Sequence, residues 1–417
     1  MLTLRALFAA VANAAEPPRM SSHRDGVSLL GYGAMRIPTV DGDVANSSSS
    51  PIDQPRFNAQ VKLLLDGGVN LFDTSAAYCR GHSESALGTA LAASGYPREK
   101  YFLSTKLSNF ARRQHSAEES KRIFENALVN LKTDYLDYFL LHSVGGKDFD
   151  ARFVKNGMLD WVFEQKRLGR IRHVGFSIHG DHERFRWLLR RHDEGRYRWD
   201  VALIQMNYVD WHHASEVNKR NENAEYLYNE LTRRGIGVLI MEPLLGGRLA
   251  KPRDAVMAEL APLDPGATPA KWAFRFCGSH PGVVSVISGM SFEEHIRENI
   301  ETFSPLKPLS DVERLALERA AAAFVGCEAV PCTECNYCMP CPYGLDIPAL
   351  IGFINDVRRR RLSGRRELRA LYERAVDDPR RRADRCIGCA RCLSHCPQQI
   401  DIPKVMDSIA GFMEEYA

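Results

Sequence analysis

The sequence lacks long hydrophobic runs, and no stretch of its 417 residues is long and apolar enough to cross a membrane. A large excess of charge of either sign is also absent, since the formal net charge is only +3. With 45 % hydrophobic and 26 % charged residues, the composition is that of an ordinary globular protein rather than a disordered one. A chain of this length accommodates one large domain and one small one.

Isolated cysteines are few, because eight of the eleven cysteines fall into two short arrays. The first array, CTECNYCMPCP, holds Cys332, Cys335, Cys338 and Cys341, and the second, CIGCARCLSHCP, holds Cys386, Cys389, Cys392 and Cys396. Such grouping indicates metal ligands, since secreted disulfide scaffolds are short and spread their cysteines along the chain. Cys277 and Cys327 receive no role, and Cys79 is expected to be an inert thiol.

The second array has the spacing of bacterial ferredoxins, in which three cysteines two residues apart are followed, three residues further on, by a fourth before proline. The first array is one residue shorter in its final gap. Zinc is the alternative, but a zinc site usually needs only two cysteine pairs. We therefore predict two 4Fe-4S clusters, with the eight cysteines of the arrays as their metal ligands.

Residues 1–22 are expected to be a leader, either disordered or an over-extended start upstream of Met20. They contain a short apolar run and an Ala-Asn-Ala that could pass for a signal-peptide cleavage site. No Arg-Arg pair precedes the run, although a twin-arginine signal would suit a protein whose clusters are assembled in the cytosol. A cytoplasmic location is therefore predicted, with export as the weaker alternative.

Short apolar strands alternate with amphipathic helical segments between residues 29 and 299. The first strand-like run lies at 30–35, and the others begin at Asn70, Tyr101, Asp134, Arg172, Ala202, Gly237 and Gly282. Such alternation predicts parallel strands joined by crossover helices. Eight units over about 270 residues favour a closed barrel over an open sheet, and no Gly-x-Gly-x-x-Gly follows the first strand.

The predicted fold is therefore α/β, with a (β/α)8 TIM barrel at 23–305 and a connecting helix at 306–326. A mainly α-helical, ferredoxin-like two-cluster domain is expected at 327–417, with helices around 348–357 and 367–376. The segments YGLDIP and QQIDIP, one after each array, indicate an internal duplication in that domain.

Polar residues end the apolar strands where a barrel of this type opens to its ligands. Asp73 ends the second strand, Lys106 the third, His142 the fourth and Ser177 the fifth, while Gln205 and Asn207 end the sixth. With Tyr78, this set makes chemical sense as a carbonyl-reducing site. A tyrosine hydroxyl is a weak acid, but a neighbouring ammonium held by a carboxylate lowers its pKa. A histidine can then donate a hydrogen bond to the carbonyl oxygen.

At these residues the chain resembles the aldo/keto reductase family, and the resemblance covers essentially the whole barrel. It is carried by GGVNLFDTSAAYCRGHSESALG, STKL, LLHS, GFS, QMNY and HIREN. The resemblance implies that Tyr78 is the general acid, that Lys106 and Asp73 set its pKa, and that His142 orients the substrate. It further implies that three residues lie near a bound nicotinamide: Ser177, Gln205 and Asn207.

The sequence departs from the family at two cofactor positions. Family members that prefer NADPH usually carry a Lys-Ser and an arginine where this chain has Gly289, Met290 and His295, while Glu298 and Asn299 are retained. Histidine is a weaker phosphate clamp than a bidentate arginine, so the choice between NADP and NAD stays open. Met241 stands where many relatives place an aromatic that stacks on the nicotinamide, and it either packs there or belongs to the core.

The arrays resemble those of two-cluster ferredoxins, in which the fourth cysteine of each run ligates the other cluster. This implies one ligand set of Cys332, Cys335, Cys338 and Cys396, and a second of Cys386, Cys389, Cys392 and Cys341. The chain is thereby identified as similar to an aldo/keto reductase subgroup with a C-terminal 4Fe-4S dicluster ferredoxin-type domain.

The arginines between 358 and 385 could attract an acidic electron-transfer partner or nucleic acid. Interleaved carboxylates favour a solvated face, and no aromatic-rich nucleic-acid motif accompanies them, so no nucleic-acid partner is expected. Two long loops, 143–157 and 209–221, are expected to shape the substrate pocket. In the second of these, Trp211, His212 and His213 are expected to face it.

The predicted function is that of an oxidoreductase that reduces a carbonyl, or oxidises an alcohol or sugar, with NADP or NAD. Two 4Fe-4S clusters would transfer electrons, and the expected partners are a small carbonyl or alcohol substrate and a redox partner protein. The alternative is a catalytically weak barrel that senses nicotinamide and carries an iron–sulfur module for structure or docking. Direct exchange between barrel and clusters is left open, because a hydride carries two electrons and each cluster accepts one.

Overall fold

The computed structural model describes residues 20–416 except Asp25, 43–49, Arg220, 326–329, Arg361, Ser363, Asp377, Pro397 and Gln399. Nearly all of the predicted leader lies outside the described residues, and so does Cys327. None of the described helices combines the length and the apolar character that a membrane crossing requires.

Eight parallel strands close into a barrel in chain order, so that the first strand pairs with both the second and the eighth. They are β1 (Leu30–Gly33), β2 (Leu71–Asp73), β3 (Phe102–Leu107), β4 (Leu136–Leu141), β5 (Ile171–Ile178), β6 (Val201–Gln205), β7 (Gly237–Met241) and β8 (Val283–Ser288). The predicted (β/α)8 barrel is therefore confirmed.

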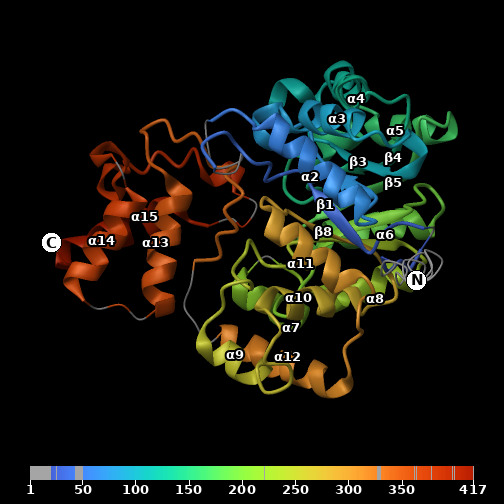
Figure 1. Ribbon diagram of the computed structural model, residues 1–417. Helices are drawn as coiled ribbons and strands as arrows, with labels where there is room; N and C mark the ends of the chain where they lie inside the picture. Colours follow the sequence, from blue (N-terminus) through green and yellow to red (C-terminus); the bar gives the residue numbers. More distant parts are fainter. Residues whose placement is uncertain are drawn as a thin grey trace, which may run out of the picture.

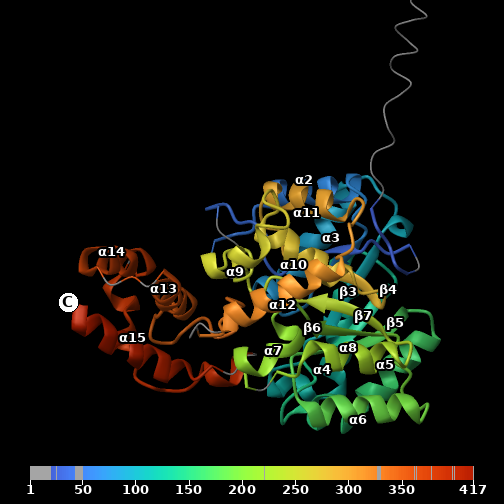
Figure 2. The same cartoon turned by 90° about the horizontal axis from the view of Figure 1, so that it is seen from below.

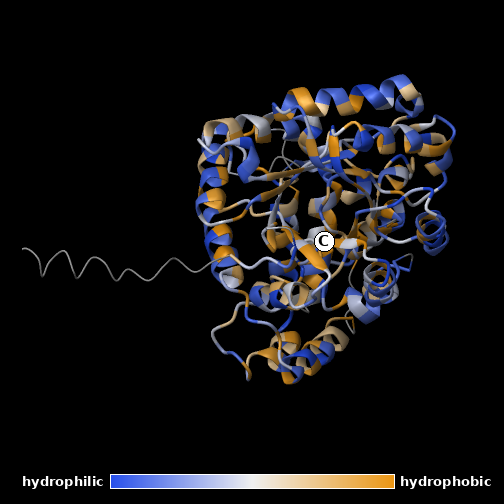
Figure 3. Cartoon of the chain, turned by 90° about the vertical axis from the view of Figure 1, so that its right-hand side faces the viewer, coloured by the Kyte–Doolittle hydropathy of each residue, from blue (hydrophilic) through white to orange (hydrophobic). Residues whose placement is uncertain are grey.

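A ring of helices surrounds the barrel (Figure 1). They are α2 (Gln54–Asp66), α3 (Ser83–Ala93), α4 (Ala117–Leu131), α5 (Met158–Arg167), α6 (His182–Asp193), α8 (Ala224–Thr232), α10 (Pro269–Gly278) and α11 (Glu293–Phe303), and α7 (Asp210–Val217) and α9 (Asp254–Leu260) are inserted after β6 and β7. Their sequences are amphipathic: α6 buries Phe185 and Leu188 and exposes Arg186. Hydrophilic and hydrophobic stretches accordingly alternate along the helices in Figure 3.

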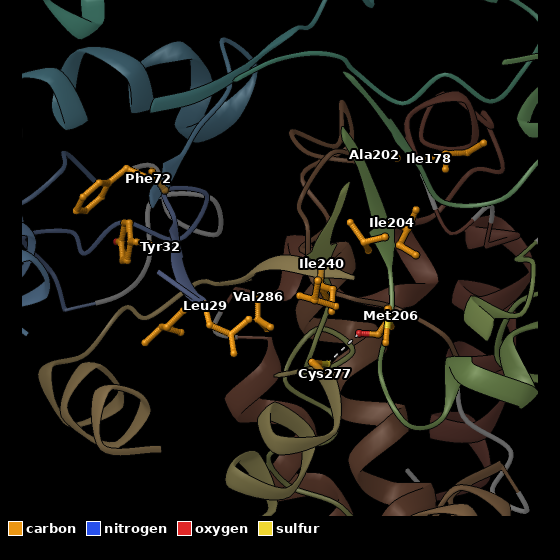
Figure 4. Close-up of a cluster of buried hydrophobic side chains, with 14 of the residues drawn as sticks. Leu29, Tyr32, Phe72, Ile178, Ala202, Ile204, Met206, Ile240, Cys277 and Val286 are labelled. Atoms are coloured by element: carbon orange, nitrogen blue, oxygen red, sulfur yellow. Dashed lines mark hydrogen bonds between the residues drawn. The ribbon is translucent and has the colours of Figure 1, made fainter. Parts of the chain in front are cut away.

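Apolar side chains of strands and helices form a packed core inside this ring (Figure 4). All six residues of β4 are buried, as expected for a parallel strand enclosed on both faces. Tyr32 and Phe72 belong to this core, with their ring centroids 6.2 Å apart. Close packing of α3 on α4 requires Gly88, because a Cβ added there would lie 2.1 Å from Asn130 O. Inside the barrel, strand residues such as Leu140, Leu203 and Leu239 form a separate buried cluster, so the barrel is filled and its ligand openings lie at the strand ends.

The chain leaves the barrel through α12 (Asp311–Val325), which packs against α9 and α7 and lies within the predicted connecting segment. Three further helices, α13 (Ile347–Arg360), α14 (Arg365–Ala375) and α15 (Ile402–Tyr416), share a hydrophobic core of their own. They lie to one side of the barrel (Figures 1 and 2). The mainly α-helical character of this part is confirmed, while the domain boundaries at 22, 305 and 326 stay predictions.

Hydrogen bonds from three loops of the barrel help to fasten this carboxyl-terminal part to it. Arg36 Nη2 donates to Thr333 O at 2.6 Å, Asn218 Nδ2 to Gln398 O at 2.7 Å, and Arg253 Nη2 to Arg358 O at 3.1 Å. The three donors follow β1, β6 and β7, so they lie on the side of the barrel where the strands end. Through Thr333, the first cysteine array is therefore held at the mouth of the barrel.

Candidate active site and cysteine arrays

A buried ion pair joins two neighbouring strands at the mouth. Lys106 Nζ, on β3, donates to Asp73 Oδ2 at 2.5 Å and to Thr74 O at 2.8 Å. Ser104 Oγ donates to Asp73 Oδ1 at 2.7 Å. The exposed fractions of the two charged side chains are 0 % for Lys106 and 4 % for Asp73. Burial lowers the pKa of Lys106 and the Asp73 carboxylate opposes this, so each group stabilises the charge of the other.

Tyr78 begins a short 3-10 turn, η1 (Tyr78–Gly81), that follows β2. Its ring centroid lies 4.7 Å from Lys106 Nζ. The next two residues, Cys79 and Arg80, have φ values of 50° and 56° in the left-handed region, which is unusual outside glycine. Such strained backbone persists mainly at functional sites, and here it directly follows the predicted acid.

The pKa of Tyr78 departs from the expectation drawn from the sequence. We expected Lys106 to lower it, but burial raises the pKa well above the usual tyrosine value, and Asp73 and Glu242 raise it further. The ammonium is already paired with Asp73, which offsets its charge. The influence that lowers the pKa of Tyr78 is a hydrogen bond with the hydroxyl of Tyr337, from the first cysteine array.

His142 follows β4, with its ring centroid 5.8 Å from that of Tyr78. Its Nδ1 lies 2.6 Å from Ser108 Oγ, which leaves Nε2 as the ring nitrogen for a substrate oxygen. Burial lowers the pKa of His142 well below its usual value, and the nearby cations Lys106 and Arg152 add to this effect. A neutral imidazole results, which can orient a carbonyl through one hydrogen bond.

Arg152 is a residue of this site that the sequence did not indicate. It lies in a π-helical turn, η4 (Asp150–Val154), within the long loop after β4. Its guanidinium donates to His142 O at 2.5 Å and to Ser143 O at 2.9 Å, and burial lowers its pKa to about 10. Arg152 thus clamps the backbone that carries His142, a role that no local sequence signal marks.

Gln205 and Asn207, predicted near the nicotinamide, share Asp210 as a partner. Asp210 Oδ2 accepts from Gln205 Nε2 at 2.8 Å and from Asn207 Nδ2 at 2.6 Å. Burial raises the pKa of Asp210 to about 6, and the two amides oppose this. Asn207 Oδ1 accepts from the backbone N of Val209 and of Asp210, so its amide holds the turn after β6. Asp210 escaped the sequence reasoning because an aspartate at a helix start is common on other grounds.

The other predicted cofactor residues lie around the same mouth. Ser177, on β5, is buried, and Met241 ends β7 in a half-buried position. Asn299 and Glu298 lie on α11, and Asn299 Nδ2 donates to Ser288 Oγ, at the end of β8, at 3.4 Å. The structure therefore gathers these residues from β5, β7 and α11 onto one end of the barrel.

Glu242 is a second carboxyl at the mouth that the sequence reasoning missed, and its side chain is half-buried. Its φ of 56° lies in the left-handed region. Burial raises its pKa to about 7, while the charge of Arg36 and a hydrogen bond with the backbone of Gly246 oppose the rise. The charge of Glu242 in turn raises the pKa of Cys335, in the first cysteine array.

The structure brings the array cysteines together in the crossed sets that the resemblance implied. Burial raises the pKa of the Cys332 and Cys335 thiols to about 12, and Cys396 of the other array adds to both shifts. The thiol of Cys338 interacts with the same three cysteines. In the second set, Cys392 interacts with Cys386, Cys389 and Cys341. The last cysteine of each array thus lies with the first three of the other.

A cavity of ≈ 410 Å³ lies among the second set, lined by Cys341, Cys386, Cys389 and Cys392 and by apolar side chains such as Ile402 and Met406. In the part of the chain that the structure describes, no three His, Cys, Asp or Glu side chains close around a single metal ion. A four-iron cluster is bulkier than one ion, and four soft thiolates around an apolar cavity are the donors it takes. The residues present therefore fit the cluster.

The first array also reaches the predicted acid. Tyr337 lies between Cys335 and Cys338, packs against the barrel core, and has its ring centroid 6.5 Å from that of Phe110. Its hydroxyl forms the hydrogen bond with the hydroxyl of Tyr78 described above. Nearby, the backbones touch: a Cβ added at Gly246, whose φ is +66°, would lie 2.5 Å from Thr333 Cα. Sequence reasoning missed Tyr337 because nothing in CTECNYC distinguishes this tyrosine from a spacer.

Two smaller expectations concern residues 211–213 and Cys79. Trp211 packs among Tyr228, Phe276 and His280, and its place beside a substrate pocket stays a prediction. In its neighbours, His212 Nε2 lies 3.3 Å from Glu225 Oε2 and His213 Nδ1 lies 2.6 Å from Glu216 Oε1. Burial raises the pKa of Cys79 to about 12, in agreement with an inert thiol.

Comparison with known proteins assigns the barrel. A sequence profile described as the aldo/keto reductase family matches residues 29–318, more than half of the chain. The chain belongs to the aldo/keto reductase family. A second profile, described as a 4Fe-4S dicluster domain, matches residues 331–400 and spans both arrays. The family and its C-terminal 4Fe-4S domain are therefore confirmed.

Related proteins cover mainly the barrel of this aldo/keto reductase. An aldo-keto reductase of Mycobacterium marinum is 38 % identical over 252 residues, which cover 58 % of this chain and 75 % of the relative. L-galactose dehydrogenase of Arabidopsis thaliana is 26 % identical over 305 residues, which cover 70 % of this chain and 89 % of the relative.

Solved structures agree with the barrel fold. An aldo-keto reductase from Bacillus halodurans in its holo form has a TM-score of 0.57 at 21 % identity, covering 72 % of this chain and 96 % of its own. An aldo-keto reductase from Klebsiella pneumoniae in complex with NADPH has a TM-score of 0.55 at 22 % identity, covering 72 % and 94 %. At these identities the likeness establishes the fold.

Proposed function

We propose that this aldo/keto reductase interconverts a carbonyl and an alcohol with a nicotinamide cofactor, and that its first iron–sulfur centre is coupled to the same site. The observation that carries the proposal is the hydrogen bond between Tyr337 and Tyr78. It joins the predicted acid to a residue flanked by two predicted cluster ligands. A module retained only for structure has no need to contact this tyrosine.

The chemistry of the chain's own residues follows from their geometry. When bound, a reduced nicotinamide supplies a hydride, and each cluster gives or takes one electron. Tyr78 gives its proton to the substrate oxygen as the alcohol forms. Tyr337 then stabilises the remaining phenolate by donating a hydrogen bond, and Lys106 adds the attraction of a charge 4.7 Å from the ring. Neutral His142 holds the substrate oxygen in place.

The remaining site residues would hold the cofactor. Ser177, Gln205 and Met241 would contact the nicotinamide, with Asn207 and Asp210 fixing the turn beneath it, and Glu298 and Asn299 would contact the adenosine end. NADPH bound to the Klebsiella pneumoniae relative supports a dinucleotide as the cofactor class. The L-galactose dehydrogenase relative supports a sugar or another hydroxy compound as the alcohol.

Replacing Tyr78 with Phe tests the assignment. General acid catalysis contributes roughly 10²- to 10⁴-fold, so reduction of a test aldehyde such as benzaldehyde by NADH or NADPH should fall by that factor. Tyr343→Phe, which changes a tyrosine just after the first array, is the matched control and should keep full activity. Unchanged aldehyde reduction in Tyr78→Phe would instead favour the catalytically weak, nicotinamide-sensing alternative.

A further inference from the structure

The second array lies at the protein surface, whereas the first lies at the barrel mouth. Cys389 is exposed, and so are three large hydrophobic side chains around it: Ile387 at 64 %, Tyr343 at 45 % and Leu393 at 36 %. Tyr343 and Ile387 line the cavity of the second cysteine set. Exposed apolar side chains that gather in one place mark an interaction surface.

The surface beside this array is strongly cationic. Between residues 379 and 396 the sequence has five arginines and one carboxylate, Asp384, and one of these arginines, Arg380, pairs at 2.6 Å with Asp378, just before this stretch. Arg385 and Arg391 are exposed, and Arg391 lines the same cavity as Cys389. Asp384 pairs with Arg382 at 3.5 Å, so its charge is already offset. The excess of positive charge therefore lies directly beside the exposed cysteine.

This distribution separates the segment into two parts. On α14, carboxylates interleave with the arginines, and Arg369 pairs with Glu373 at 3.2 Å, as expected for a solvated face. Beyond residue 379 the carboxylates thin out, while the apolar side chains and the predicted cluster ligands begin. An apolar centre with a charged rim is the arrangement of protein–protein interfaces.

We propose that this surface, made of Tyr343, Ile387, Leu393, Arg385 and Arg391 and here called the second-array face, docks a small acidic protein that carries one electron at a time. The inference rests on the proposed function, which delivers electrons to the clusters. In each encounter one electron passes from the reduced second cluster to the oxidised carrier, so the cluster is oxidised by one electron and the carrier reduced by one. No bond is formed or broken and no proton moves.

The chemistry of the face suits such a carrier better than nucleic acid. The apolar side chains next to Cys389 provide a dry contact through which an electron can pass. The phosphate backbone of a nucleic acid gains no favourable interaction from such side chains. The arginine rim steers an acidic protein to this side and sets its orientation. A small, transient interface is expected, because electron carriers must leave after each transfer.

The test uses the anaerobically purified holoprotein and an acidic plant-type two-iron ferredoxin as the probe. The face variant is Arg385→Glu with Arg391→Glu. The control, Arg365→Glu with Arg366→Glu, changes the net charge equally at the start of α14. That end lies roughly 10 Å along the helix from Tyr372, whose hydroxyl accepts from Ala383 N beside the second array. Iron content and visible spectrum are compared first, because Arg385 and Arg391 adjoin predicted ligands.

Binding of the ferredoxin should weaken about tenfold or more in the face variant and stay within about twofold of wild type in the control. Wild-type binding should also weaken several-fold when salt is raised from roughly 50 to 300 mM. Ile387→Ser, which keeps all charges, should weaken binding as well and serves if the face variant loses its cluster. Reduction of benzaldehyde by nicotinamide should be the same in the Arg365→Glu with Arg366→Glu control as in the wild type.

Equal ferredoxin affinity in the face variant and the control would overturn the proposal. Equally tight binding of a basic c-type cytochrome or of a DNA duplex would also overturn it. The proposed function is tested separately, because ferredoxin binding is measured without substrate. It fails if the wild-type protein does not reduce the aldehyde.

Discussion

Replacing Tyr337 with Phe removes one hydroxyl and leaves the ring packed against Phe110 and the barrel core. The lost hydrogen bond acts on Tyr78, whose oxygen becomes negative as its proton leaves. A hydrogen bond to a charged group is worth roughly 1.5–3 kcal/mol. If the whole of it acts in the transition state, the rate of carbonyl reduction falls roughly 10- to 150-fold.

The assay is the steady-state reduction of benzaldehyde at saturating nicotinamide, with iron content checked to show that the clusters are retained. We expect kcat to fall and KM to change little, because the phenolate exists in the transition state and not in the bound ground state. Tyr343→Phe removes an equivalent hydroxyl from an exposed tyrosine nearby and should have no effect. A kcat in Tyr337→Phe within about twofold of wild type would refute the role assigned to Tyr337.

Three further predictions concern stability and the clusters. Burial raises the pKa of Asp210 from 3.8 to about 6, so its contribution to stability is present below pH 3.8 and is lost as pH rises through 6. The free energy of unfolding should therefore fall by about 1 kcal/mol between about pH 5 and 7 in wild type and less in Asp210→Asn, and equal slopes in denaturant titrations would contradict this. Lys106→Met leaves the Asp73 carboxylate buried and unpaired and should destabilise the protein by about 3–5 kcal/mol. An unchanged denaturation midpoint would contradict this. If the ligand sets are crossed, the double variant Cys332→Ser with Cys396→Ser should keep one cluster. The double variant Cys386→Ser with Cys396→Ser should then keep none. An iron count that gives the reverse would support uncrossed arrays.

Much of the fold was predictable because its signals are local. Alternating apolar and amphipathic segments marked all eight strands, since hydrophobic periodicity is written into each segment separately. The positions of Asp73, Lys106 and His142 followed in turn, because parallel strands of a barrel end on the same side. The spacing of the cysteines within each array was equally local.

What could not be predicted depends on contacts between distant segments. Arg152 reaches His142 by the return of a loop, and Tyr337 reaches Tyr78 across more than half of the chain. The pKa of Tyr78 was also misjudged. The sequence placed a cation near the phenol, but only the packed structure reveals how strongly burial acts and how fully Asp73 engages Lys106.

If the proposed coupling holds, the barrel site and the iron–sulfur clusters exchange electrons through the contact of Tyr78 with Tyr337. An anaerobic titration of the oxidised holoprotein with reduced nicotinamide, followed by the visible absorbance of the clusters, tests it most directly. One nicotinamide carries two electrons and each cluster accepts one, so about one equivalent of reduced nicotinamide should bleach both clusters. Cluster absorbance that stays unchanged, with and without a carbonyl or alcohol substrate, would contradict the account.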